Sequence, residues 1–161
     1  MDFNDSKALL SSGFEGFETI GNLWSDKSII PREIGVYLVI SNSSSISFLV
    51  PGVGGFFKGK NPNVDEDTLK DNWVASSKVV YIGKAGSSTG KATLRSRLGQ
   101  YLRFGQGANV GHWGGRLIWQ SRITRTCSFV GSQRPAKTLE RLNTILYQIL
   151  KYNSALCLLP T

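Results

Sequence analysis

Acidic residues are almost missing from the second half of this chain of 161 residues. Residues 72–161 contain 13 bases and a single acid, Glu140, whereas residues 1–71 contain 10 acids and 6 bases. The two parts have balances of +12 and −4, which together give the net charge of +8. A half so basic favours a polyanionic partner, because contacts to phosphates release condensed counterions. A basic surface that serves only solubility is the alternative.

Cysteine and histidine are scarce, with two cysteines and one histidine in the chain. Cys127 and Cys157 do not form a CxxC pair, and with His112 they are too few for a Cys/His zinc cluster. This pattern indicates a reduced, cytoplasmic protein, with a disulfide between the two cysteines as an open alternative.

Long apolar runs are also absent. No stretch of 18 apolar residues occurs, so the sequence predicts no transmembrane helix. The N-terminus begins with acidic residues and lacks the basic and apolar regions of a secretory signal. No basic amphipathic helix stands out either, so we expect no membrane partner. The length predicts one domain over residues 31–161, preceded by an N-terminal extension over residues 1–30.

Several short apolar runs predict β-strands. Residues 34–40 are β-branched and apolar on both faces, which is typical of a buried strand. Residues 79–82 and 126–130 predict two more strands. Residues 46–50 follow a polar turn-like stretch and predict a strand that pairs with the first as a hairpin.

Helical periodicity is clearest in two later segments. Leu94, Leu98, Tyr101 and Leu102 predict an amphipathic helix with Thr93 as its N-cap. Residues 135–150 carry a longer apolar stripe and begin with Pro135, which suits a first helical turn. Weaker helical patterns cover residues 14–20 and 64–69, and residues 116–120 fit either a helix or a strand. The elements predict an α/β domain of the α+β type, with a small mixed, mainly antiparallel sheet of three to four strands flanked by helices.

A glycine-rich loop over residues 85–91 lies between a predicted strand and a predicted helix, as in a nucleotide-binding P-loop. Two features oppose that interpretation. Ala92 stands where the Ser or Thr that binds magnesium is needed, and no Asp occurs after Asp71. A small phosphate-binding switch protein is therefore only a minor alternative, which measurable nucleotide binding would support.

Two tripeptides indicate a function other than nucleotide binding. Gly35-Val36-Tyr37 precedes Tyr81-Ile82-Gly83, and the second tripeptide continues as Lys84-Ala85. In this order they resemble the GIY-YIG nuclease superfamily, and the resemblance covers about residues 31–153. Between the two tyrosines the chain is much longer than is usual in that family, so we expect an insertion around residues 43–75. The resemblance implies a GIY-YIG-like fold.

The same resemblance assigns roles to later residues. It implies that Arg97 is the catalytic arginine of a helix on which Tyr101 follows one turn later, so both share a face. It further implies that Glu140 binds the metal from a later helix, which closes at Tyr152-Asn153. The loop between Lys84 and Arg97 is longer than usual in the family. Taken alone, Glu140 has a second interpretation as a charge that favours a helix N-terminus.

The residue types suit phosphodiester hydrolysis with one metal ion. A single carboxylate can hold one Mg²⁺ or Mn²⁺, with water and phosphate oxygens completing the shell, whereas a two-metal site needs several clustered acids. Arg97 supplies a planar cation for phosphate oxygens. The candidate catalytic residues are Tyr37, Tyr81, Lys84, Arg97, Tyr101, His112 and Glu140, and Glu140 is also the candidate metal ligand. The candidate nucleic-acid-binding residues are Arg95, Arg103, Arg116 and Asn153.

We therefore expect a DNA endonuclease, with RNA as the alternative polymer. A non-cleaving nucleic-acid-binding module on the same fold is the competing hypothesis. Each residue alone also fits a structural role, since a strand tyrosine usually packs in a core and His112 fits either role equally well. Three aromatic residues are candidates for stacking on bases or for core packing, namely Phe104, Trp113 and Trp119.

Overall fold

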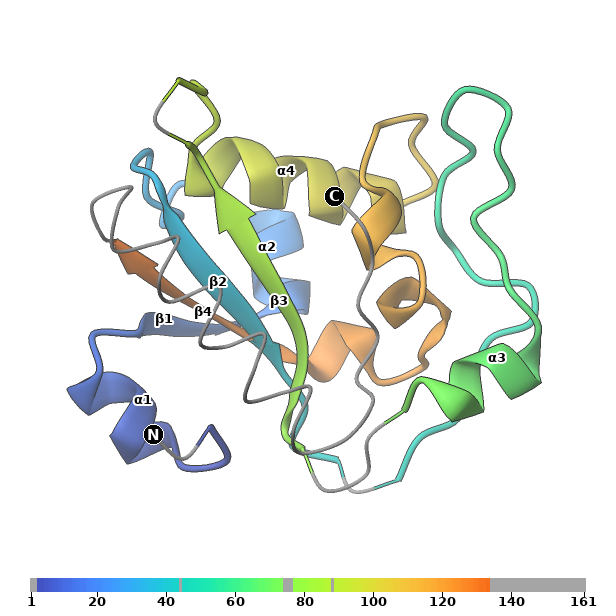
Figure 1. The fold of residues 1–161 in the computed structure, drawn as a ribbon, viewed down its shortest axis with the longest axis horizontal. Helices are drawn as coiled ribbons and strands as arrows, with labels where there is room; N and C mark the ends of the chain where they lie inside the picture. The colour runs from blue at the N-terminus through green and yellow to red at the C-terminus, as the bar shows by residue number, and fades with distance from the viewer. Residues whose placement is uncertain (1–2, 44, 74–76, 88, 134–161) are drawn as a thin grey trace.

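The structure is a computed structural model, and it describes residues 3–43, 45–73, 77–87 and 89–133 (Figure 1). Four strands form one sheet in the order β1-β4-β2-β3, and every pairing between them is antiparallel. The strands are β1 (Glu15–Thr19), β2 (Gly35–Ile40), β3 (Val79–Ala85) and β4 (Ser128–Gln133). The predicted α+β fold, a small antiparallel sheet flanked by helices, is confirmed.

Strand β2 lies inside the sheet, and all six of its residues are buried. It pairs with β3 on one edge and with β4 on the other. Side chains alternate along it, so that Tyr37 and Val39 belong to one apolar cluster and Val36 and Leu38 to another on the opposite face. The run of apolar residues that predicts this strand is explained by burial on both faces.

Helices cover both faces of the sheet. Helices α2 (Ile20–Ser25) and α4 (Leu94–Gly105) contribute to the cluster that contains Tyr37, and α1 (Ser6–Ser11) contributes to the opposite one (Figure 1). The predicted helix and cap are confirmed in α4. The Thr93 hydroxyl accepts a hydrogen bond from the backbone N–H of Ser96, and the Ser96 hydroxyl accepts one from Thr93. This reciprocal capping box satisfies two amide groups at the start of the helix.

Shorter helical elements lie in the connections. Helix α3 (Glu66–Asp71) follows the N-cap Asp65 and confirms the acidic helical turn expected there. Three 3₁₀ turns join α4 to β4, namely η1 (Trp113–Gly115), η2 (Ile118–Gln120) and η3 (Thr124–Thr126). The segment 116–120, which fits either a helix or a strand, thus contains a 3₁₀ turn, and the strand predicted at 126–130 begins two residues later and extends to Gln133.

Two expectations for secondary structure are wrong. Residues 46–50 do not form a hairpin strand, and the described part of this segment makes only an isolated bridge, between Phe48 and Ser121. The reason is that β3 and β4 occupy both edges of β2. The helical spacing at residues 14–20 also misleads, because Glu15–Thr19 form strand β1. Gly13 and Gly16 have positive φ angles there, and β4 supplies the pairing partner.

The segment expected as an N-terminal extension contributes to the sheet, since β1 pairs with β4 at its edge. Some predictions fall outside the described residues. They are the helix at 135–150, Glu140 and Asn153. Within the described ranges, no helix combines the length and the apolar character needed to cross a membrane.

Candidate active site

The two tripeptide tyrosines meet on one face of the sheet. Tyr37 lies on β2 opposite Gly83, and Tyr81 lies on the neighbouring strand β3 opposite Val39. Both side chains point to the face covered by α4, and their ring centroids are 6.0 Å apart. The two tyrosines thus lie on adjacent strands. Neighbouring strands are about 4.8 Å apart, so this separation is compatible with a shared site.

Gly83 makes this arrangement possible. A Cβ atom at this position would lie 2.1 Å from Cζ and 2.3 Å from the hydroxyl oxygen of Tyr37. The Tyr37 ring is fully buried and has no room to move away. The glycine of the second tripeptide is therefore required because the ring of the first tripeptide's tyrosine lies across it.

We expect Gly83→Ala to lower the free energy of unfolding by about 1–3 kcal/mol, the usual cost of overpacking a filled core. Gly99→Ala is the matched control, because no atom lies within 4 Å of a Cβ added there in α4. This control should raise the free energy of unfolding by up to about 1 kcal/mol, since alanine favours a helix over glycine. Urea denaturation of both variants tests the pair. Parental stability of Gly83→Ala would show that the ring does not need this space.

Tyr101 and His112 complete an aromatic cluster around Tyr81. The ring of Tyr101, from α4, stacks on that of Tyr81 with centroids 5.9 Å apart. His112 lies before η1, and its ring meets Tyr101 edge-on at 5.2 Å and Tyr81 at 6.2 Å. We call these four residues the tyrosine–histidine cluster: Tyr37, Tyr81, Tyr101 and His112.

Two glycines that sequence reasoning missed bring the His112 loop to this cluster. A Cβ at Gly114 would lie 2.7 Å from the Tyr81 hydroxyl, and one at Gly115 would lie 2.9 Å from the Tyr101 ring. The Gly-Gly pair directly after His112-Trp113 was the available signal. Only a residue without a side chain allows so close an approach at both positions.

Polar atoms are buried in the cluster without partners. Among the described residues, the hydroxyls of Tyr37 and Tyr101 and both ring nitrogens of His112 lack a hydrogen bond. The indole N–H of Trp119, whose ring lies 5.0 Å from that of Tyr101, lacks one as well. Buried polar groups without partners are costly, so their concentration at one place points to a bound water, ion or substrate group.

Burial sets the protonation states of the cluster. It raises the pKa of the Tyr37 and Tyr101 hydroxyls well above the ordinary value, and it raises the pKa of Tyr81 as well. No hydrogen bond of normal geometry reaches the Tyr37 hydroxyl, although Tyr81 is near enough to affect its pKa. Burial also lowers the pKa of His112 to about 3. At neutral pH the tyrosines are therefore hydrogen-bond donors and the imidazole is neutral.

The positive charge of Arg97 acts on three members of the cluster. It opposes the burial effect on the pKa of Tyr37 and Tyr81, and it adds to burial in lowering the pKa of His112. Arg97 is half-buried on α4 and donates a hydrogen bond to Gln100 at 3.1 Å. An anion placed between Arg97 and the tyrosine hydroxyls would thus meet a cation and neutral donors together.

Neutral His112 should make the fold sensitive to acid. Its pKa in the folded chain, about 3, lies below the value of 6.5 expected when unfolded. The unfolded chain therefore binds the proton first, and the stabilisation is complete above pH 6.5 and is lost between pH 6.5 and about 3. The loss should approach about 1.4 kcal/mol per pH unit. The free energy of unfolding, measured by denaturant titration at several pH values in this range, should depend less on pH in His112→Asn than in the parent. The same pH dependence in both proteins would contradict this assignment.

Two predicted site residues are not brought to the cluster. Lys84 is opposite Val36 in the register, on the face of the sheet away from Tyr37 and Tyr81. Lys84 was expected at the site because it directly follows the second tripeptide. Successive residues in a strand face opposite sides of the sheet, so its side chain points away from the cluster. Arg95, expected to contact nucleic acid, instead donates hydrogen bonds to the backbone carbonyls of Ile30 and Ser28. It fixes the segment that leads into β2.

The remaining predicted residues differ in their surroundings. Arg103 is exposed on α4, and the guanidinium of Arg116 lies 4.8 Å from the ring of Trp113. Of the three aromatic residues considered for stacking, Trp113 is exposed, whereas Trp119 and Phe104 are buried in the core. Glu140 and Asn153 lie outside the described residues.

The described part of the site offers hydroxyl and imidazole groups but no carboxylate. No group of three or more His, Cys, Asp or Glu residues that could hold a metal ion occurs among the described residues. Protonated hydroxyls and a neutral imidazole suit the water shell of a hard cation better than direct ligation.

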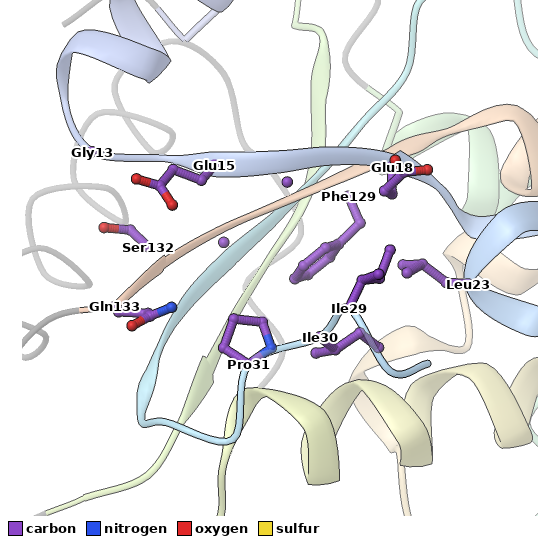
Figure 2. A pocket seen from close by; sticks show the side chains of 12 residues that line it. Gly13, Glu15, Glu18, Leu23, Ile29, Ile30, Pro31, Phe129, Ser132 and Gln133 are labelled. Carbon is purple, nitrogen blue, oxygen red and sulfur yellow. The ribbon is translucent and has the colours of Figure 1, made fainter. Parts of the chain in front are cut away.

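A separate cavity of about 550 Å³ opens beside β1 (Figure 2). Phe129 lines it and separates it from the cluster, since the Phe129 ring lies 5.5 Å from that of Tyr37. Glu15 and Glu18 are among its lining residues, and carboxylates repel phosphate. This cavity is therefore not part of the candidate active site.

Comparisons of the chain with protein-family models, with curated proteins and with solved structures find no match. A function must therefore be inferred from the chemistry of the residues themselves.

Proposed function

We propose that this chain is a divalent-metal-dependent endonuclease that hydrolyses DNA phosphodiester bonds by a single-metal mechanism of the GIY-YIG type. One observation carries the proposal. Three tyrosines and a neutral histidine form one cluster, and the charge of Arg97 acts on Tyr37, Tyr81 and His112. Four polar atoms of the cluster have no partner among the described residues. The two hydroxyls and the single N–H of the neutral imidazole are hydrogen-bond donors, and donors beside a cation suit the charged phosphate of a reacting diester.

The surrounding charge supports a polyanionic substrate. Residues 72–133, which include β3, α4 and β4, contain nine bases and no acid. Exposed bases there include Lys78, Lys91, Arg103, Arg122 and Arg125. DNA affinity should therefore fall steeply as salt rises, because each phosphate contact releases a counterion.

Each member of the cluster has a distinct role in this proposal. Arg97 neutralises charge on the phosphate as the transition state forms. The fully buried Tyr37 and Tyr101 hydroxyls contribute neutral dipoles beneath Tyr81. Tyr81 is the least buried of the tyrosines and orients the attacking water. Neutral His112 packs against Tyr81 and Tyr101, and its unprotonated ring nitrogen accepts a hydrogen bond. A Mg²⁺ ion held by Glu140 would polarise the phosphate and activate the water.

The test is cleavage of supercoiled plasmid DNA by the full chain in Mg²⁺ or Mn²⁺, with and without a chelator. We expect nicked or linear product with metal and none with chelator. Cleavage that continues in excess chelator would contradict a metal-dependent mechanism, and intact plasmid under every metal condition would contradict nuclease activity.

A non-cleaving nucleic-acid-binding module is the second candidate. The observation in its favour is that Tyr37 and Tyr101 are completely buried, as residues with a purely structural role would be. Salt-dependent DNA binding without any metal-dependent cleavage would support this function instead.

A further inference from the structure

The connection between β2 and β3 is built onto the far end of α4. The backbone N–H of Gly55 donates a hydrogen bond of 2.9 Å to the carbonyl of Phe104, which lies in the C-terminal turn of α4. The buried side chain of Gln120 accepts from the backbone N–H of Val64 at 2.9 Å and donates to its carbonyl at 3.0 Å. These bonds hold the connection in a defined position.

The tip of this connection, residues 56–60, presents aromatic and basic side chains to solvent. Phe56 is 54% exposed, and Lys58 and Lys60 are exposed beside it. The ammonium group of Lys58 lies 5.5 Å from the ring centre of Phe57. An isolated bridge between Phe57 and Lys60 closes the tip. The tip thus combines an exposed large aromatic ring with two exposed cations.

The tip is packed against the loop that carries the site histidine. A Cβ at Gly111, the residue before His112, would lie 3.1 Å from the Phe57 ring. Figure 1 shows the connection and the loop after α4 side by side. Trp113 follows on this loop, is 41% exposed and has the guanidinium of Arg116 over its ring. The next residue, Gly114, adjoins the Tyr81 hydroxyl. A second aromatic–cation pair, in which the ring is exposed, thus lies beside the cluster.

We propose that Trp113 and Phe56, exposed on two loops that pack together at Gly111 and Phe57, form a stacking platform for unpaired nucleobases, so that the preferred substrate is DNA with a single-stranded or unpaired segment. The inference rests on the proposed function for the identity of the polymer. Bases in a closed duplex are already stacked on each other, whereas unpaired bases offer a free face to an aromatic ring. Lys58, Lys60 and Arg116 place positive charge where the backbone on either side of those bases would run.

The full chain is tested by fluorescence anisotropy in chelator, which prevents cutting. Its affinity for a labelled duplex with a central unpaired bubble is compared with that for the fully paired duplex of the same sequence. The parent should prefer the bubble. Trp113→Ala and Phe56→Ala should each lower bubble affinity about 5- to 150-fold, the contribution of one stacked base. Affinity for the paired duplex should change little.

Matched variants separate stacking from other effects. Ile29→Ala, which alters an equally exposed apolar side chain on another part of the surface, should bind both DNAs like the parent. Trp113→Phe should recover bubble affinity, and Trp113→Leu should not. Equal affinity of the parent for both DNAs, or equal rescue by leucine and phenylalanine, would overturn the proposal. A change in oligomeric state without a change in DNA affinity would also overturn it and assign the surface to contacts between copies.

The outcome is independent of nuclease activity. Preference for the bubble that is lost in both alanine variants supports the platform even if the parent cuts no DNA in Mg²⁺. Metal-dependent cleavage of paired and bubble DNA at equal rates, with no loss of affinity in the variants, supports the nuclease and rejects the platform.

Discussion

Replacing Arg97 with alanine is expected to lower the rate of DNA cleavage by about 10²–10³-fold, the usual cost of removing one preorganised stabilising group. The guanidinium charge acts on Tyr37, Tyr81 and His112. In the proposed mechanism its loss would remove the cation that neutralises the phosphate. Metal binding should not change, because the proposed ligand Glu140 remains. Single-turnover cleavage at saturating protein measures the chemical step.

Two controls show whether the position or merely the charge matters. Arg122→Ala removes the same charge from an exposed site outside the cluster and should alter cleavage at saturating protein little. Arg97→Lys keeps the charge but loses the planar, forked geometry, so it should recover only part of the rate. Equal rates for Arg97→Ala and Arg122→Ala would reject Arg97 as a catalytic residue.

Glu140→Gln is expected to lower cleavage about 10²–10⁴-fold at a fixed magnesium concentration, because a bound metal supplies several kcal/mol of charge stabilisation. Glutamine keeps the size of the side chain but removes the charge that holds a hard cation. Residues 72–161 contain no other carboxylate that can substitute. Stability should fall only by about 0.3–1 kcal/mol, the effect of a charge near a helix N-terminus.

DNA binding separates loss of metal from loss of substrate. Affinity of Glu140→Gln for DNA should be equal to or tighter than that of the parent, since one charge that repels phosphate has gone. Glu15→Gln is the matched control, because this glutamate lines the separate cavity beside β1, and it should cut like the parent. A Glu140→Gln protein that cleaves at the parental rate would exclude Glu140 as the metal ligand.

The parts of the fold that were predictable depend on local signals. The run over residues 34–40 predicts β2 because its alternating side chains are apolar on both faces. Thr93 and the spacing of the following leucines predict α4, which needs only a cap and one apolar face. The adjacency of Tyr37 and Tyr81 followed from the two tripeptides, and the strand register confirms it.

The parts that were not predictable depend on pairing between distant segments. Strand β1 forms because β4, more than a hundred residues later, offers its edge. Residues 46–50 have strand-like composition but find both edges of β2 occupied. Composition within a segment does not contain this information, because strand formation depends on a partner.

Some site residues were likewise predictable from local spacing, whereas others depend on contacts between distant segments. Tyr101 was predictable from its helical spacing to Arg97, whereas the contact of His112 with both tyrosines depends on how its loop folds back. Lys84 and Arg95 illustrate the converse. Lys84 follows the second tripeptide and Arg95 lies two residues before Arg97. Strand alternation nevertheless directs Lys84 to the other face, and Arg95 donates hydrogen bonds to two backbone carbonyls. Sequence proximity to a motif does not determine the direction of a side chain.

The most direct test of the central claim is a side-by-side cleavage assay of the parent and Tyr81→Phe in Mg²⁺. This change removes one hydroxyl oxygen from the cluster and leaves the ring that stacks on Tyr101. We predict metal-dependent cutting by the parent and a rate at least about 100-fold lower for Tyr81→Phe, as expected when the hydroxyl that orients the attacking water is lost. Equal rates for the two proteins would contradict a reaction centre at the tyrosine–histidine cluster.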